Sequence, residues 1–174
     1  MMDAGKSSTG DVFGFEIGEV AGTEEKRRIA RSVLEALTDW FGNPEAREDY
    51  ILKSGGWPMV AAFDGKDAVG FLCLKETGKA TAEVAVMGVR KEYHRKGIGR
   101  ELFRAAKQIV KEKGYSFLQV KTVALGMYED YDRTNRFYQS LGFQEFEVIP
   151  ELWGEENPCQ IYVMALKGPD PEKE

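Results

Sequence analysis

The stretch Ala82-Glu-Val-Ala-Val-Met-Gly-Val-Arg-Lys-Glu-Tyr-His-Arg-Lys-Gly-Ile-Gly-Arg100 contains the features that decide the fold. Residues 82–89 are mostly apolar and have the length of a buried strand. A loop with two glycines follows, and after Gly97 apolar side chains recur at the spacing of an amphipathic helix, which Gly114 ends. Residues 117–123 form the next apolar run. A strand, a helix and a strand in this order predict a parallel, right-handed crossover in a mixed α/β sheet.

Further strands and helices lie on both sides of this crossover in the sequence. Thr23 can cap a helix whose apolar stripe continues to Phe41, and a second helix follows Pro44. The turn at residues 64–67 joins two apolar runs as a hairpin. We expect strands at residues 12–20, 57–63, 68–74, 82–89, 117–123, 143–149 and 160–166, and a last helix at 134–141. The predicted order is therefore β-α-α-β-β-β-α-β-α-β-β, an α/β fold with helices on both faces of the sheet.

Length and composition indicate one globular domain. The chain has 174 residues, of which 43% are hydrophobic and 30% are charged. We expect a single domain over residues 12–167, with mobile segments at 1–11 and 168–174. Cys73 and Cys159 are far apart in sequence, which favours a reducing compartment, and a single histidine argues against a zinc site. We therefore expect no metal. Because no stretch is of signal-peptide or membrane-spanning type, we also predict a cytoplasmic protein with no membrane contact.

The charge of the chain is negative overall but positive in one place. A net charge of −5 at pH 7 argues against general nucleic-acid binding. Between Arg90 and Arg100, five basic residues stand against Glu92 alone, which leaves a local charge of +4. Such an island in an acidic protein predicts a small anionic ligand.

The loop His94-Arg-Lys-Gly-Ile-Gly99 is the best candidate for holding that ligand. Its glycines let backbone N–H groups approach a ligand closely, and the positive end of the following helix favours a pyrophosphate. The alternative is a glycine turn beside ordinary surface lysines. A dinucleotide fold would need a third glycine where Leu102 stands, and Gly5-Lys-Ser7 resembles a Walker loop only by chance, since no strand precedes it.

A second motif, Phe137-Tyr-Gln-Ser-Leu-Gly-Phe143, begins about 40 residues after the glycine loop. Together, the two motifs and the element order resemble the GNAT superfamily of N-acetyltransferases over roughly residues 12–167. The resemblance implies the acyl-CoA N-acyltransferase fold, with a splayed central sheet and acetyl-CoA as co-substrate. It departs from the family pattern at His94, where Gln or Arg is usual, and at Tyr131 and Thr134, where Asn and Ala are common.

The resemblance also implies which residues contact the coenzyme. The backbone of residues 87–89 corresponds to the family's splayed strand, against which pantetheine lies like an added strand. Gly88 suits a bulge there, or only relieves packing. Asn135 is displaced from the family's usual amide position but is included. The implied set is Met87, Gly88, Val89, His94, Arg95, Lys96, Gly97, Ile98, Gly99, Arg100 and Asn135.

Three catalytic roles follow from amine attack on a thioester. Glu83 lies fourteen residues before Gly97, as the catalytic glutamate does in the histone-acetylating branch, and is implied as the base. Alternatively it is a solvated glutamate and water accepts the proton. Tyr138 occupies the family's tyrosine position and is implied as the acid for the leaving thiolate, or else is a core aromatic. The Met87 N–H would stabilise the oxyanion.

Three features of the sequence are candidates for the site that binds the acceptor amine or lies near it. The segment Tyr128-Glu-Asp-Tyr-Asp132 would attract and stack on a cationic amine if it forms a rim, but it would equally serve as a solvated loop. Trp57 and Trp153 are candidates for an acceptor pocket or for packing. Cys159 is expected to be a small buried hydrophobe and not a nucleophile.

The function expected from these residues is transfer of an acetyl group from acetyl-CoA to a primary amine of a small cationic molecule. A peptide or protein acceptor is one alternative. A CoA-binding regulatory module without turnover is another. We expect no nucleic-acid partner, and a homodimer is compatible with the sequence.

Overall fold

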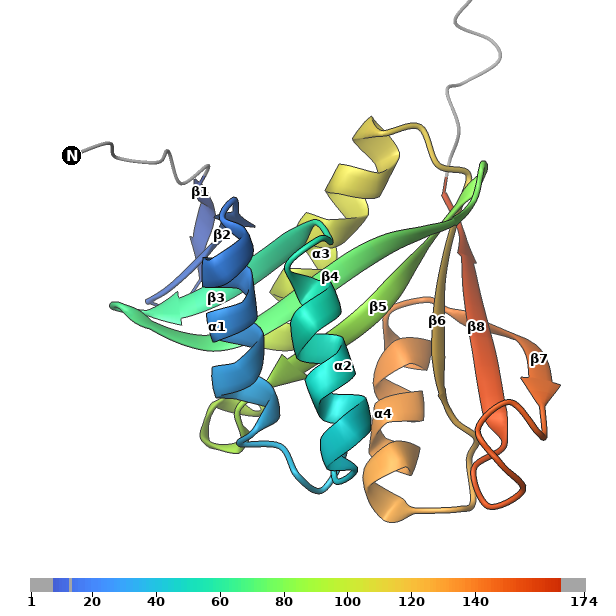
Figure 1. Ribbon diagram of the computed structural model, residues 1–174. Coiled ribbons are helices and arrows are strands. Elements are labelled where there is room, and N and C mark those ends of the chain that lie inside the picture. The colour runs from blue at the N-terminus through green and yellow to red at the C-terminus, as the bar shows by residue number, and fades with distance from the viewer. Residues whose placement is uncertain (1–7, 13, 167–174) are drawn as a thin grey trace, which may run out of the picture. The chain divides into compact units, whose positions relative to one another are not determined.

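The computed structural model describes residues 8–12 and 14–166 (Figure 1). Its elements form a mixed α/β fold, as the sequence predicts. None of the helices in this part of the chain is long and apolar enough to cross a membrane. The helices are α1 (Thr23–Leu34), α2 (Pro44–Ser54), α3 (Ile98–Glu112) and α4 (Glu129–Ser140), and the strands are β1 (Ser8–Val12), β2 (Phe15–Val20), β3 (Met59–Asp64), β4 (Asp67–Gly78), β5 (Thr81–Val89), β6 (Phe117–Val123), β7 (Gln144–Ile149) and β8 (Cys159–Ala165).

The chain divides into two compact units. The first contains the chain up to Lys75 together with Ala85–Ile109, and the second contains Glu76–Val84 and the chain from Val110. Strands β4 and β5 therefore pass from one unit into the other. In hydrogen-bonded order, the first unit has β1-β2-β3-β4-β5 and the second has β5-β6-β8-β7. The single domain expected over residues 12–167 stays a prediction, and residues 1–7 and 167–174 lie outside the described part.

The first unit begins with one strand more than the sequence predicts. Strands β1 and β2 pair antiparallel, with Val12 opposite Phe15, and β2 and β3 pair antiparallel in turn. We expected one strand over residues 12–20 and a mobile segment at residues 1–11, whereas residues 8–12 form a strand. The residues Ser8-Thr-Gly-Asp-Val12 lack the hydrophobic alternation that is typical of a strand. Strand β1 is therefore defined by its backbone pairing with β2, which the side-chain pattern does not indicate.

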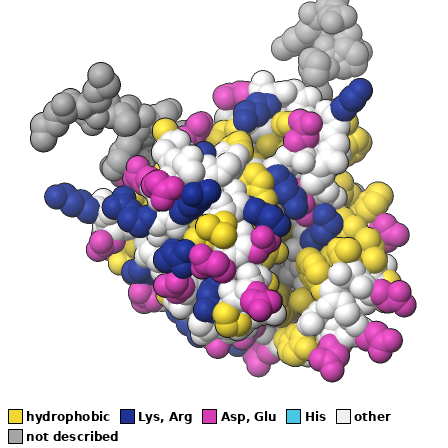
Figure 2. Space-filling model, viewed as in Figure 1, with side chains coloured by type: hydrophobic (Ala, Val, Ile, Leu, Met, Phe, Trp, Pro, Cys, Tyr) yellow, Lys and Arg dark blue, Asp and Glu magenta, His cyan; other side chains and the backbone are white. Residues whose placement is uncertain are grey.

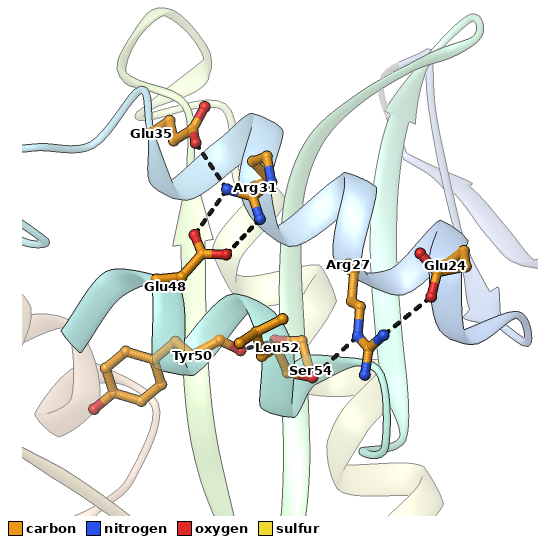
Figure 3. A network of polar contacts seen from close by, with 8 residues as sticks. All are labelled: Glu24, Arg27, Arg31, Glu35, Glu48, Tyr50, Leu52 and Ser54. Atoms are coloured by element: carbon orange, nitrogen blue, oxygen red, sulfur yellow. Dashed lines mark hydrogen bonds and ion pairs between the residues drawn. The ribbon is translucent and has the colours of Figure 1, made fainter. Parts of the chain in front are cut away.

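Helices α1 and α2 pack side by side and are joined by polar contacts (Figure 3). The Arg31 guanidinium donates to both carboxylate oxygens of Glu48, at 2.8 and 2.7 Å, and these hydrogen bonds lower the pKa of Glu48. Arg27 Nε donates to the carbonyl oxygen of Leu52, near the end of α2. Figure 2 shows basic and acidic side chains interspersed on this face. Ion pairs this exposed contribute little to stability.

The ends of these helices differ partly from expectation. Asn43 caps α2 by accepting a hydrogen bond from Ala46 N, with Pro44 as the first helical residue. The residue that caps α1 is Gly22, where we expected Thr23, and it makes no side-chain cap. Helix α1 ends at Leu34, so the apolar residues that follow pack from a series of turns and not from a longer helix.

The core of the first unit lies between α1, α2 and the strands. Its buried residues come from α1 and the segment after it, from α2 and from strands β2 to β5, and α1 contributes four of them. Deletion of methylene groups from such a core costs about 2–5 kcal/mol for a leucine or isoleucine shortened to alanine. The cluster contains Val20, Ile29, Ala30, Val33, Leu34, Leu37, Ile51, Met59, Ala61, Phe63, Phe71, Cys73 and Val86.

The second unit contains the expected parallel pair. The start of β5 runs parallel to β6, with Thr81 opposite Phe117 and Val84 opposite Val120. Strand β8 pairs antiparallel with β6 on one side and with β7 on the other, which leaves β7 at the edge. The parallel crossover predicted from the sequence is therefore confirmed in its strand direction.

Candidate active site

The glycine loop has the geometry of an anion-binding turn. Arg95 and Gly97 both adopt positive φ angles, 62° and 80°, directly before α3 begins at Ile98. A Cβ atom placed on Gly97 would meet no atom within 4 Å, so the space over this residue is open. The first N–H groups of a helix have no partner within the helix. Open space beside these donors fits a phosphate group.

The basic residues around this loop fall into two groups, those held by contacts within the first unit and those exposed to solvent. Arg90 Nη2 donates to Ser32 Oγ at 2.7 Å, and Lys91 forms an ion pair with Asp39. These two cations are therefore held by α1 and by the turn that follows it. Three other cations of the expected island are exposed, namely Arg95, Lys96 and Arg100. The positive charge presented to solvent is thus smaller than the net +4 that the sequence indicates.

The side chain of His94 does not lie as expected. The resemblance includes His94 among the coenzyme contacts, but its Nε2 is 2.5 Å from the carbonyl oxygen of Val89 and must donate to it. The ring also packs edge-on against Trp40, with 5.8 Å between centroids. His94 therefore closes the turn between β5 and the glycine loop, and its Nε2–H is not available for a ligand.

Tyr93 fixes the loop from its other side. Its hydroxyl donates to Asp64 Oδ2 at 2.9 Å, and this hydrogen bond raises the pKa of the phenol. The ring contacts Phe15 edge-on at 5.7 Å, and Lys96 Nζ lies 5.4 Å from its centroid. The loop is therefore attached to the β3–β4 turn and to β2 within the same unit.

Gly88 is needed for packing. A Cβ atom on this residue would lie 2.8 Å from Leu37 Cδ1 and 3.2 Å from Val33 Cγ1, which is closer than carbon atoms normally approach. The alternative that we weighed, relief of packing, is the one these contacts support. The neighbouring side chains of Met87 and Val89 are half-buried.

Glu83 is a buried carboxylate and not a solvated one. The residue is 3% exposed, and its Oε1 accepts a hydrogen bond from Lys121 Nζ at 2.7 Å. Sequence reasoning missed Lys121, although one signal was present. It is the only charged residue in the otherwise mostly apolar strand β6.

Tyr138 lies on α4 with its ring among other aromatic side chains. It is 6% exposed, and its ring centroid is 5.8 Å from Phe143 and 6.3 Å from Tyr162. The ring packs as a core aromatic would.

Asn135 has a structural role in place of the coenzyme contact we expected. Its side chain is fully buried, and Nδ2 donates to the carbonyl oxygens of Val123 at 2.8 Å and Tyr131 at 2.7 Å. Its Oδ1 accepts a hydrogen bond from the Tyr162 hydroxyl at 2.7 Å. Both amide hydrogens are used inside the unit, so none is left for a ligand.

The acidic segment before Tyr138 belongs mainly to the first turn of α4, where we had expected a loop. Acids are favoured there by the helix dipole. Arg133 pairs with Glu129 at 2.8 Å and lies 3.8 Å from Asp130, and Asp132 accepts a hydrogen bond from Gly126 N at 2.8 Å. Arg133 therefore offsets part of the expected negative rim, and Asp132 is engaged with the preceding turn.

The remaining candidates have packing roles or lie in turns. Trp57 packs against the core of the first unit, while Trp153 is 40% exposed in the turn between β7 and β8. Cys73 and Cys159 are buried, and burial raises their thiol pKa values to about 12 and about 11. Neither thiol is a nucleophile at neutral pH. The described residues contain no group of three or more metal-ligating side chains.

Solved structures of several acetyltransferases share this fold. The ribosomal-protein-S18-alanine N-acetyltransferase from Escherichia coli has a TM-score of 0.72 at 15% identity, over 92% of this chain and 99% of that one. The IAA acetyltransferase from Bacillus cereus has a TM-score of 0.68 at 21% identity, over 87% of this chain and 99% of that one. An aminoglycoside 6'-N-acetyltransferase complexed with coenzyme A has a TM-score of 0.67 at 18% identity over 88% and 99%. At these identities the likeness shows the fold alone.

Sequence comparison identifies the family. No curated protein matches the chain. A family model described as the acetyltransferase (GNAT) domain matches residues 55–145, which is more than half of the chain. This range includes the candidate base, the glycine loop and the tyrosine motif of α4. The chain therefore belongs to the GNAT family and is an acetyltransferase.

Proposed function

We propose that the enzyme transfers the acetyl group of acetyl-CoA to a primary amine of a small cationic molecule, by direct attack within a ternary complex. The observation that carries the proposal is the buried carboxylate of Glu83, on the strand that leads into the glycine loop. A protonated amine must lose a proton before it can attack, and a fixed carboxylate is a suitable acceptor for it.

The coenzyme would be held by the first unit. Acetyl-CoA fits the open turn at Gly97, where the N–H groups of residues 97–99 would meet the pyrophosphate. The exposed side chains of Arg95 and Lys96 would add charge-assisted contacts. The Met87 N–H would stabilise the oxyanion as the thioester carbonyl is attacked.

Proton transfers would be carried out by the second unit. Glu83 would take the proton of the amine, directly or through water, as the C–N bond forms. As the C–S bond breaks, Tyr138 would give its phenolic proton to the thiolate, a role that fits a phenol because it keeps its proton at neutral pH. Substitution of Tyr138 by Phe retains the ring among its aromatic neighbours and removes only the hydroxyl.

A cationic acceptor is supported by the residues that remain exposed near the start of α4. Tyr128 is 45% exposed and contacts Tyr131 edge-on at 6.1 Å, and such rings attract cations through their faces. A peptide with a free amine is the competing acceptor, since one structural neighbour acts on the alanine of a ribosomal protein, according to its name.

The experiment is thiol release from acetyl-CoA, measured against a panel of polyamines, amino sugars, amino acid derivatives and peptides. Turnover with small amines and not with peptides supports the proposal, and the reverse result makes the enzyme a peptide acetyltransferase. No turnover with any amine, although CoA binds, would favour a regulatory module. With the acceptor known, Tyr138→Phe should lower kcat by roughly 10²–10⁴ with little change in acetyl-CoA affinity.

A further inference from the structure

The ion pair between Glu83 and Lys121 joins two neighbouring parallel strands of the second unit. Glu83 lies opposite Gln119 in the register of β5 and β6, so Lys121 is the next residue of β6 on the same face of the sheet. The distance from Nζ to Oε1 is 2.7 Å. Side-chain exposure is 5% for Glu83 and 25% for Lys121, so the carboxylate is inside the protein and the ammonium group lies at its edge.

Stability alone does not explain such a pair. Moving two charges out of water costs several kcal/mol per ion, and the attraction between them often only compensates for this cost. Apolar residues of similar size would hold two adjacent strands together equally well. What the pair does provide is a carboxylate with a fixed orientation and a cation beside it.

Another titratable group lies close to the pair. Cys159, at the start of β8, is fully buried, and its thiol pKa is raised first by burial, while Lys121 lowers it and Glu83 raises it. Gln119, the register neighbour of Glu83, is uncharged and donates to Thr77 Oγ1 at 2.9 Å. Lys121 from β6 and Cys159 from β8 are thus two titratable groups that the neighbouring strands place close to Glu83.

We propose that Lys121 is a positioning residue for Glu83: its ammonium group, 2.7 Å from Oε1, orients the carboxylate for proton transfer. This inference rests on the proposed role of Glu83 as base. In each turnover the amine proton moves to Glu83, Lys121 keeps its own protons, and the proton on Glu83 then passes to solvent. A buried carboxylate without a cation beside it is protonated more readily, so fewer enzyme molecules would be competent in mildly acidic solution.

The test is the pH dependence of kcat/KM between pH 5 and 9 for Lys121→Met, which keeps the length of the side chain and removes its charge. We expect the acidic limb to move to higher pH by at least one unit, so that activity at pH 6 falls about tenfold while activity at pH 8.5 changes little. Lys121→Arg should restore the wild-type limb. Lys113→Met, at an exposed lysine of the same unit, changes the net charge equally and should leave the profile unmoved.

The outcomes separate this inference from the proposed function. If Glu83→Gln flattens the acidic limb but Lys121→Met leaves it in place, Glu83 is the base and the role of Lys121 is refuted. If Glu83→Gln keeps the wild-type limb, the role of Glu83 as base fails and the inference fails with it. Circular dichroism checks that each variant is folded, and Lys121→Gln replaces the methionine variant if that one is not.

Discussion

Replacement of Asn135 by alanine should destabilise the enzyme without weakening its affinity for acetyl-CoA. The side chain is fully buried and makes three hydrogen bonds inside the second unit, at 2.7–2.8 Å. The Asn135→Ala variant would leave the carbonyl oxygen of Val123 without the amide donor and the Tyr162 hydroxyl without its acceptor. The Tyr131 carbonyl oxygen would be less affected, because it also lies in the backbone ladder of α4.

The size of the effect follows from these contacts. A buried acceptor that loses its donor costs about 1–3 kcal/mol. The Tyr162 hydroxyl would lose the acceptor for its proton, while its oxygen still accepts a hydrogen bond from Gln139 Nε2 at 3.3 Å. We expect a decrease of about 3 kcal/mol in the free energy of unfolding, or roughly 6–12 °C in Tm for a protein of this size.

The assay is urea unfolding followed by circular dichroism, with calorimetric titration of acetyl-CoA at a temperature where the variant is folded. Ser140→Ala is the matched control on the same helix, because the exposed Ser140 hydroxyl donates to Phe137 O, a carbonyl of its own helix, at 2.7 Å. It should change stability by less than about 0.5 kcal/mol. A variant of Asn135 with wild-type stability and a tenfold weaker affinity would refute the structural role and restore the coenzyme contact.

Three further predictions concern the two glycines and the thiols. Gly97→Asp should raise the Kd for acetyl-CoA at least tenfold by calorimetry, because a carboxylate would occupy the open space beside the helix N-terminus; unchanged affinity in a folded variant would contradict this. Gly88→Ala should lower the unfolding free energy by about 1–3 kcal/mol in urea, since its Cβ would lie 2.8 Å from Leu37 Cδ1, and shortening Leu37 to Val in the same chain should recover part of the loss. Burial raises the thiol pKa values of Cys73 and Cys159 to about 12 and about 11, so both should resist a thiol reagent at pH 8 until the protein is unfolded, and rapid labelling of the native protein would show that they are not buried. Because the neutral thiols are favoured only in the folded state, the free energy of unfolding should decline as the pH rises past about 9.

The family and the position of the glycine loop could be predicted from local sequence. The strand at residues 82–89, the glycines of the loop and the helix that follows are each defined by neighbouring residues, whose spacing appears directly in the chain. The cap of α2 is equally local, because Asn43 and Pro44 stand next to each other at its start. These elements agree with the structure within a few residues.

Other elements were missed for lack of a local signal. Strand β1 has no hydrophobic alternation. The first turn of α4 is acidic where we looked for apolar periodicity, although acids suit a helix N-terminus and were available as a signal. His94 was assigned by family position, but its ring donates to the carbonyl of Val89, five residues earlier.

Periodicity and motifs within short segments were enough to predict the order of strands and helices from β2 onward, the position of the glycine loop and the family. Only the tertiary structure decided which side chains meet. Lys121 and Glu83 are separated by 38 residues, and Asn135 and Tyr162 by 27, so no spacing along the chain predicts either contact. The pairing of β5 with β6, and the packing of α4 beside β8, bring these groups within hydrogen-bond distance. Burial raises the free-energy cost of losing either contact, because a polar group removed from water needs a hydrogen-bond partner within the protein.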